Sequence, residues 1–118
     1  MRRRLAGLAG VLLLALPTAA AAHSLLLESH PAPGSTVRAL ARVTLRFNNR
    51  IEKRLSRVVI VDARRVRHEL SVVAAEGGLD TLAVLAPPLG PGKYDLEWRV
   101  LSADGHVVNG RYPFQVVR

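Results

Sequence analysis

Asp104-Gly105-His106 places a carboxylate and an imidazole two residues apart, directly after the most regularly alternating segment of the chain. Both groups are metal ligands, and the glycine between them lets the backbone turn so that the two side chains converge. A simpler interpretation also exists, because Asp-Gly is first of all a turn dipeptide and a lone exposed histidine is usually solvated. The motif therefore predicts half of a metal site, whose other half has to come from elsewhere in the chain.

Residues 1–22 have the pattern of a cleaved signal peptide. Three arginines precede an apolar run of 12 residues, Leu5 to Leu16, and Pro17 to Ala22 ends in the small residues typical of a signal peptidase site. The run is too short to span a bilayer, which takes about 20 residues. We expect cleavage before His23, export to the periplasm, no membrane insertion after cleavage, and one mature domain over residues 23–118.

Cleavage there would make His23 the amino-terminal residue. Its free α-amine and its imidazole Nδ1 could then close a six-membered chelate on one metal ion. Together with Asp104 and His106, the donors are three nitrogens and one carboxylate oxygen, a set that suits tetragonal Cu(II). Protons compete for the nitrogens, so we expect copper affinity to fall as the medium is acidified.

The composition excludes several classes of function. The chain has no cysteine, which removes thiolate catalysis, disulfides and cysteine-based zinc sites. It holds 17 Lys plus Arg and nine Asp plus Glu, and removal of the three leader arginines leaves 14 minus 9, a net charge of +5. With only five aromatic residues in addition, the sequence does not indicate a nucleic-acid-binding protein.

Short strands separated by turn signals account for most of the mature chain. Arg42–Phe47 and Lys93–Leu101 alternate between apolar and polar residues, whereas Val58–Val61 is β-branched throughout. Ile51–Arg57 reads as a charged connection with a short helical turn, and Asp62–Arg67 as a hairpin loop. The remaining predicted strands are His23–Glu28, Leu70–Ala74, Thr81–Leu85 and Tyr112–Val116. The pattern predicts an all-β fold, a small antiparallel Greek-key β-sandwich or barrel of immunoglobulin-like character.

These residues resemble a known family. The resemblance covers essentially the whole mature chain. Its motifs are the leader followed at once by His23, Ser29-x-Pro31-Ala32-x-Gly34, Leu45-x-Phe47 and Gly92-x-Tyr94-x-Leu96-x-Trp98-Arg99-Val100-x-Ser102-Ala103-Asp104-Gly105-His106-x-Val108-x-Gly110-x-x-x-Phe114-x-Val116. They are similar to the CopC family of periplasmic copper-resistance proteins. The last third of the chain carries the most specific part of the likeness.

The resemblance implies a cupredoxin-like β-domain that holds Cu(II) through the amino-terminal histidine, an aspartate and a second histidine, here His23, Asp104 and His106. It also implies an inner-membrane copper importer of the CopD type as partner. The sequence departs from the family pattern in two respects. Its only methionine is Met1, so a methionine-rich Cu(I) site is absent. Asn49 stands where some relatives have an acidic residue, and it is left out of the ligand set.

Other polar and aromatic residues near the motifs have ordinary interpretations. We expect His30 to be exposed beside Pro31, His68 to be a surface residue, and Trp98 to pack in the core. Glu28 and Arg99 could orient metal ligands.

The function that the sequence favours is an exported, monomeric Cu(II)-binding carrier or buffer for copper homeostasis or resistance, without enzymatic activity. One alternative is a copper enzyme with a histidine brace, similar to lytic polysaccharide monooxygenases. A carboxylate from Asp104 would block a coordination position that oxygen chemistry needs open, and there is no evident flat aromatic surface for a polysaccharide. The other alternative is a metal-free interaction module with an immunoglobulin-like scaffold.

Overall fold

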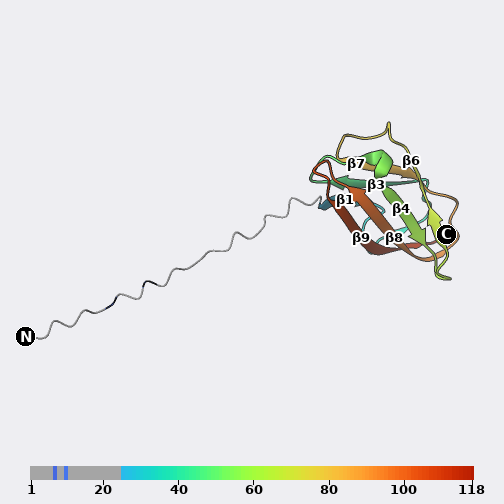
Figure 1. Ribbon diagram of the computed structural model, residues 1–118. Coiled ribbons are helices and arrows are strands. Elements are labelled where there is room, and N and C mark those ends of the chain that lie inside the picture. Colours follow the sequence, from blue (N-terminus) through green and yellow to red (C-terminus); the bar gives the residue numbers. More distant parts are fainter. Residues whose placement is uncertain (1–6, 8–9, 11–24) are drawn as a thin grey trace, which may run out of the picture.

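Two β-sheets packed against each other form the folded part of the chain (Figure 1). The computed structural model describes residues 7, 10 and 25–118. Within them the strands are β1 (Leu26–His30), β2 (Thr36–Val37), β3 (Arg42–Phe47), β4 (Arg57–Val61), β5 (Arg67–Glu69), β6 (Ser71–Val72), β7 (Thr81–Leu85), β8 (Gly92–Leu101) and β9 (Val107–Val116), and one 3₁₀ turn, η1, spans Lys53–Leu55. Among these residues, no helix is long and apolar enough to cross a membrane.

The sheets have four and five strands, in the orders β1-β3-β7-β6 and β2-β9-β8-β4-β5. The predicted all-β sandwich is therefore confirmed. All strand pairs are antiparallel except one: the short β2 runs parallel to the end of β9, with Thr36 opposite Gln115. Strands β8 and β9 form the longest ladder, from Gly92 opposite Val116 to Leu101 opposite Val107. This ladder ends at the loop that carries Asp104 and His106.

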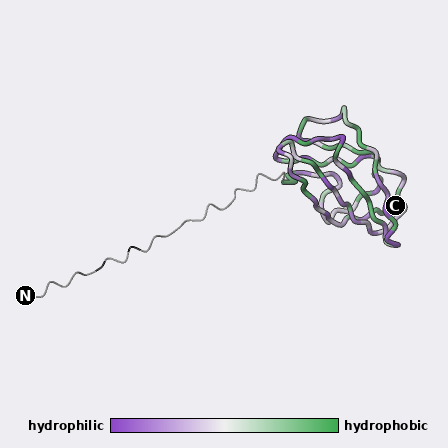
Figure 2. The backbone as a smooth tube through the Cα atoms, viewed as in Figure 1, coloured by the Kyte–Doolittle hydropathy of each residue, from purple (hydrophilic) through white to green (hydrophobic). Residues whose placement is uncertain are grey.

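The core lies between the sheets and is built by the alternation that the sequence shows. Val43, Leu45 and Phe47 of β3 are fully buried, and Leu96 and Val100 of β8 meet them from the other sheet. Each such side chain contributes about 1.5–3 kcal/mol by leaving water. Figure 2 shows hydrophobic and hydrophilic stretches interleaved along the strands, as expected for half-buried sheets.

Three predicted strands differ from those of the structure by more than one residue at an end. The first strand is Leu26–His30 rather than His23–Glu28, and the last begins at Val107, not Tyr112. The predicted strand Leu70–Ala74 is wrong in a more instructive way. The chain crosses from one sheet to the other at the buried Leu70, so that β5 precedes it and β6 follows it on different sheets. The pattern of apolar residues does not reveal that the chain changes sheets here, because both sheets bury the same kind of side chain.

The first half of β9 was not predicted because it contains Gly110, and the packing of Trp98 shows why a glycine stands there. The indole of Trp98 packs on the core, half-buried, beside Tyr112 at a ring-centroid distance of 5.7 Å. Gly110 lies directly opposite Trp98 in the ladder, and a Cβ at this glycine would overlap the indole ring. The sequence Asn109-Gly110 reads as a strand breaker, yet here the glycine makes room for a large side chain.

Tyr112 ties β9 to the first turn. Its hydroxyl donates a hydrogen bond to the carbonyl oxygen of Pro31 at 2.6 Å, across a buried part of the sandwich. Burial raises the pKa of the Tyr112 phenol, because the phenolate would lose its hydration.

The hairpin loop predicted between β4 and β5 is confirmed, and an aspartate organises it in place of a glycine. Asp62 Oδ1 accepts hydrogen bonds from the backbone N–H groups of Arg64 and Val66, at 2.9 and 3.0 Å. The Val66 amide and the imidazole of His68, 3.2 Å from Asp62 Oδ2, lower the pKa of the Asp62 carboxyl. Arg65 takes the positive φ of 68° that the turn requires. His68 lies in β5, partly exposed at the surface as expected, and its imidazole contacts the aspartate of this loop.

Candidate metal centre

The connection between β8 and β9 is a tight turn held by its own backbone. The N–H of Ser102 donates to the carbonyl oxygen of His106 at 2.8 Å, and the N–H of Gly105 donates to the carbonyl oxygen of Ser102 at 2.9 Å. Gly105 has a φ of 88°, a conformation that other residues adopt only with strain. The turn therefore fixes the relative positions of the residues on either side of the glycine.

Asp104 and His106 converge, as the sequence predicts. Asp104 Oδ2 lies 3.3 Å from His106 Nδ1, and Asp104 Oδ1 accepts the His106 backbone N–H at 3.1 Å. The carboxylate is thus oriented by the same loop that carries the imidazole. Side-chain exposure is 28% for Asp104 and 57% for His106, so both donors are accessible from solvent. A carboxylate oxygen and an imidazole nitrogen at this separation can contribute to one metal site.

The beginning of the described chain is fastened near this loop by Asn48. The Leu25 N–H donates to Asn48 Oδ1 at 2.7 Å, and the Asn48 N–H donates to the Leu25 carbonyl oxygen at 3.0 Å. Two residues further on, the carbonyl oxygen of Arg50 accepts the N–H of Ala103 at 3.0 Å. The segment 48–50 therefore connects the start of β1 to the loop that carries Asp104 and His106.

Asn48 is the positioning residue that sequence reasoning missed. In the sequence, Asn48-Asn49 signals only the end of a strand. The pairing with Leu25 depends on β1 lying next to β3, which the sequence does not reveal.

Among residues 25–118, no group of three or more His, Cys, Asp and Glu side chains is placed to hold a metal ion. Asp104 and His106 supply two donors. The third predicted ligand residue, His23, lies outside the described residues.

The structure also places the remaining candidate residues. His30 is exposed, as expected, and stands opposite Thr44 at the end of β1 away from Leu25. Glu28 Oε2 accepts a hydrogen bond from Arg46 Nε at 3.1 Å, which satisfies it locally. Asn49 accepts the Arg50 N–H through its side-chain oxygen. Arg99 lies on the outer face of β8, exposed to solvent.

The described sandwich matches the model of a known protein family. The model of the CopC domain matches residues 26–117, nearly the whole described sandwich. The chain belongs to the CopC family. One relative, copper resistance protein C of Pseudomonas syringae pv. tomato, is 33% identical over 115 residues, which cover 92% of this chain and 89% of the relative.

Solved CopC structures have the same fold. The crystal structure of CopC from Methylosinus trichosporium OB3b superposes with a TM-score of 0.70 at 35% identity, covering 80% of this chain and 93% of that one. PcoC of Escherichia coli, described as a methionine-rich copper resistance protein, gives 0.69 at 26% identity and covers 81% of this chain and all of PcoC. These CopC relatives are named for copper resistance and not for a catalysed reaction, in agreement with the non-enzymatic expectation.

Proposed function

We propose that this CopC-family protein is an exported Cu(II) carrier or buffer that acts in copper homeostasis or resistance. The ligands would be the α-amine and imidazole of His23, the carboxylate of Asp104 and the imidazole of His106. The observation that carries the proposal is the convergence of Asp104 and His106 in a loop whose backbone is bonded to the segment that holds Leu25.

Chain length supports the inclusion of His23. Two residues of extended chain reach at most about 7 Å, so His23 has to lie within that distance of Leu25. Leu25 is held from both its N–H and its carbonyl by Asn48, and Arg50 reaches Ala103, which precedes Asp104. A ligand residue two positions before Leu25 would therefore be tethered to an anchored point of the chain, which would lower the entropy cost of closing a chelate with the loop.

The chemistry of the donors supports Cu(II) in particular. Three nitrogens and one carboxylate suit the tetragonal geometry of Cu(II), whereas Cu(I) prefers thioether and thiolate sulfur. The only methionine of the chain is Met1, and there is no cysteine. PcoC is described as methionine-rich, and this chain differs from it in that respect. We therefore propose a single site for the oxidised ion, without a second site for Cu(I).

The cellular part of the proposal follows from the predicted leader. Cleavage after residue 22 would release the mature chain 23–118 into the periplasm as a monomer and would create the amine ligand. Delivery to an inner-membrane importer of the CopD type would then be the step that follows copper binding.

The decisive experiment compares the chain 23–118 with a version carrying one additional residue ahead of His23. Both are titrated with Cu(II) and examined by electron paramagnetic resonance. We expect one tightly bound equivalent with a nitrogen-rich tetragonal spectrum for the first protein, and much weaker binding for the second. Equal binding by both proteins would contradict the amino-terminal chelate.

Two substitutions test the loop ligands against a matched histidine. Asp104→Asn and His106→Asn should each weaken Cu(II) binding and change the spectrum. His68→Asn removes a histidine of β5 that contacts Asp62, and it should leave the spectrum unchanged. If His68→Asn weakened binding as much as His106→Asn, the proposed site would be misplaced.

A further inference from the structure

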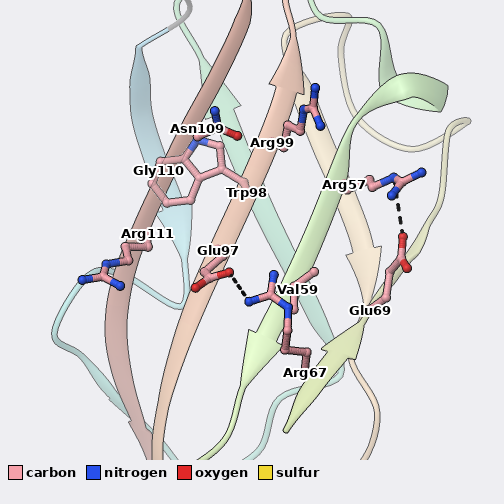
Figure 3. A pocket seen from close by; sticks show the side chains of 10 residues that line it. All are labelled: Arg57, Val59, Arg67, Glu69, Glu97, Trp98, Arg99, Asn109, Gly110 and Arg111. Carbon is pink, nitrogen blue, oxygen red and sulfur yellow. Dashed lines mark ion pairs between the residues drawn. The ribbon is translucent and has the colours of Figure 1, made fainter. Parts of the chain in front are cut away.

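The outer face of the five-stranded sheet carries an open hollow of about 560 Å³ (Figure 3). It lies on the side opposite the core, because Arg57 alternates with the buried Val58, and Arg99 with the buried Val100. Six charged side chains from four strands line it: Arg57, Arg67, Glu69, Glu97, Arg99 and Arg111. Four arginines against two glutamates give the hollow a net charge of +2.

The two carboxylates do not neutralise all four cations. Arg67 Nη1 lies 2.8 Å from Glu97 Oε2, a close ion pair. Arg57 Nε is 3.8 Å from Glu69 Oε1, and the side chains are 72% and 65% exposed, so this pair contributes little to stability. In the described part of the chain, no carboxylate lies within 4.0 Å of the guanidinium of Arg99 or Arg111. Figure 3 shows the Arg111 side chain extending away from Glu97.

Strand register brings two of these arginines together. Arg57 of β4 stands directly opposite Arg99 of β8 in the antiparallel ladder. Like charges in opposed positions destabilise a sheet, so this arrangement costs free energy in the isolated protein. A carboxylate bound between the two guanidinium groups would remove the repulsion and form charge-assisted hydrogen bonds. The register therefore points to an anionic ligand at this place.

The same two arginines, Arg57 and Arg99, also border an apolar surface near the end of β8. A second hollow, of about 270 Å³, is lined by Arg57 and Arg99 together with Leu55, Leu101 and Val107. Leu55 is 67% exposed and Val107 is 44% exposed. Val107 directly follows His106, so this surface includes the neighbour in the chain of a candidate metal ligand.

We propose that the two hollows form a docking surface for a partner protein that presents an acidic segment with interspersed apolar side chains. Its carboxylates would bind Arg57 and Arg99, and its apolar side chains would cover Leu55 and Val107. Docking there places the partner against the loop of Asp104 and His106, where copper could pass between the proteins. This last step rests on the proposed function, whereas the docking itself does not.

An anionic membrane is the less suitable occupant. Glu69 and Glu97 lie on the same face as the arginines, and a uniformly negative surface would repel them. A protein segment can instead place its carboxylates over the arginines alone. Mixed charge with an apolar border is thus the pattern of a selective protein interface.

The test uses a short fluorescent peptide of alternating Glu and Leu, titrated with the copper-free chain 23–118 and followed by anisotropy. We expect saturable binding that weakens with added salt, and no binding of the corresponding Lys-Leu peptide. Replacing both arginines, Arg57→Gln with Arg99→Gln, should weaken binding by about tenfold or more, because each removes a charge-assisted contact. Amide resonances of Leu55, Arg99 and Val107 should shift on titration.

A matched control changes the same charge elsewhere. Arg38 and Arg64 are exposed, the first after β2 and the second in the β4–β5 turn. The double variant Arg38→Gln with Arg64→Gln should bind the peptide as the parent does. Equal loss in both double variants would mean non-specific charge attraction and would overturn the proposal. Unchanged binding in the Arg57/Arg99 variant would do the same.

Two further measurements separate the remaining outcomes. Vesicles containing anionic phospholipid are tested in parallel, and arginine-dependent binding to vesicles without peptide binding would replace the proposed protein partner with a membrane. A Cu(II) titration of the Arg57/Arg99 variant should match the parent, which shows that the fold and the metal site are intact. Because peptide binding is measured without copper, failure of the proposed copper site would leave the docking result standing.

Discussion

Asn48→Ala tests whether the anchoring of Leu25 builds the metal site. The substitution removes the acceptor of the Leu25 N–H at 2.7 Å and leaves the backbone bond from the Asn48 N–H to the Leu25 carbonyl. One such hydrogen bond contributes about 0.5–1.5 kcal/mol net. At about 1.4 kcal/mol per factor of ten, Cu(II) affinity of the chain 23–118 should fall about two- to tenfold, since the ligand residue ahead of Leu25 becomes less confined.

The assay is a Cu(II) titration against a competing chelator, with urea unfolding measured alongside. Only the start of β1 should loosen, so the unfolding free energy should change by less than about 1 kcal/mol while hydrogen exchange at the Leu25 amide accelerates. Asn49→Ala is the control, because the Asn49 side chain accepts the Arg50 N–H, whereas the Leu25 N–H is bonded by Asn48. If Leu25 exchange accelerated and copper affinity stayed at the parent value, anchoring would be irrelevant to the site.

Two further predictions concern the sandwich. Gly110→Ala should lower the unfolding free energy by about 1–3 kcal/mol and shift the fluorescence of Trp98, because the new Cβ meets the indole. Gly90→Ala is the control, because a Cβ there meets nothing within 4 Å, and it should change the unfolding free energy by less than about 0.5 kcal/mol. If both substitutions lowered the unfolding free energy equally, the packing of Trp98 on Gly110 would be refuted. Tyr112→Phe should cost about 1–3 kcal/mol at neutral pH by leaving the Pro31 carbonyl unpaired. Burial raises the pKa of Tyr112, so the unfolded state loses this proton first and the parent is destabilised as pH rises above about 10. The difference in unfolding free energy between Tyr112→Phe and the parent, measured with urea, should therefore become smaller above about pH 10. A difference that stays constant with pH would contradict the burial of Tyr112.

Half of the candidate site was predictable because it is local. Asp104 and His106 are separated by one glycine, so a tight turn at that glycine is enough to bring the two side chains together. The alternation in Arg42–Phe47 and Lys93–Leu101 likewise predicted strands and their buried faces, since a side-chain period of two residues needs no knowledge of the partner strand.

Asn48 shows the limit of such reasoning. Its sequence context indicates only a strand end, and its bond to Leu25 exists because β1 and β3 are neighbours. The crossing at Leu70 has the same origin, because an apolar residue is equally buried by either sheet.

By itself, the sequence determined an all-β fold without cysteine, the turn that carries the two proposed metal donors, and the family to which the chain is similar. These follow from composition, local period and turn chemistry. Only the tertiary structure decided which strands are neighbours, and with that the juxtaposition of Arg57 with Arg99 and the attachment of Leu25 to Asn48. Such contacts join residues far apart in the chain. They depend on strand register, which is set by the packing of the whole core rather than by any one segment.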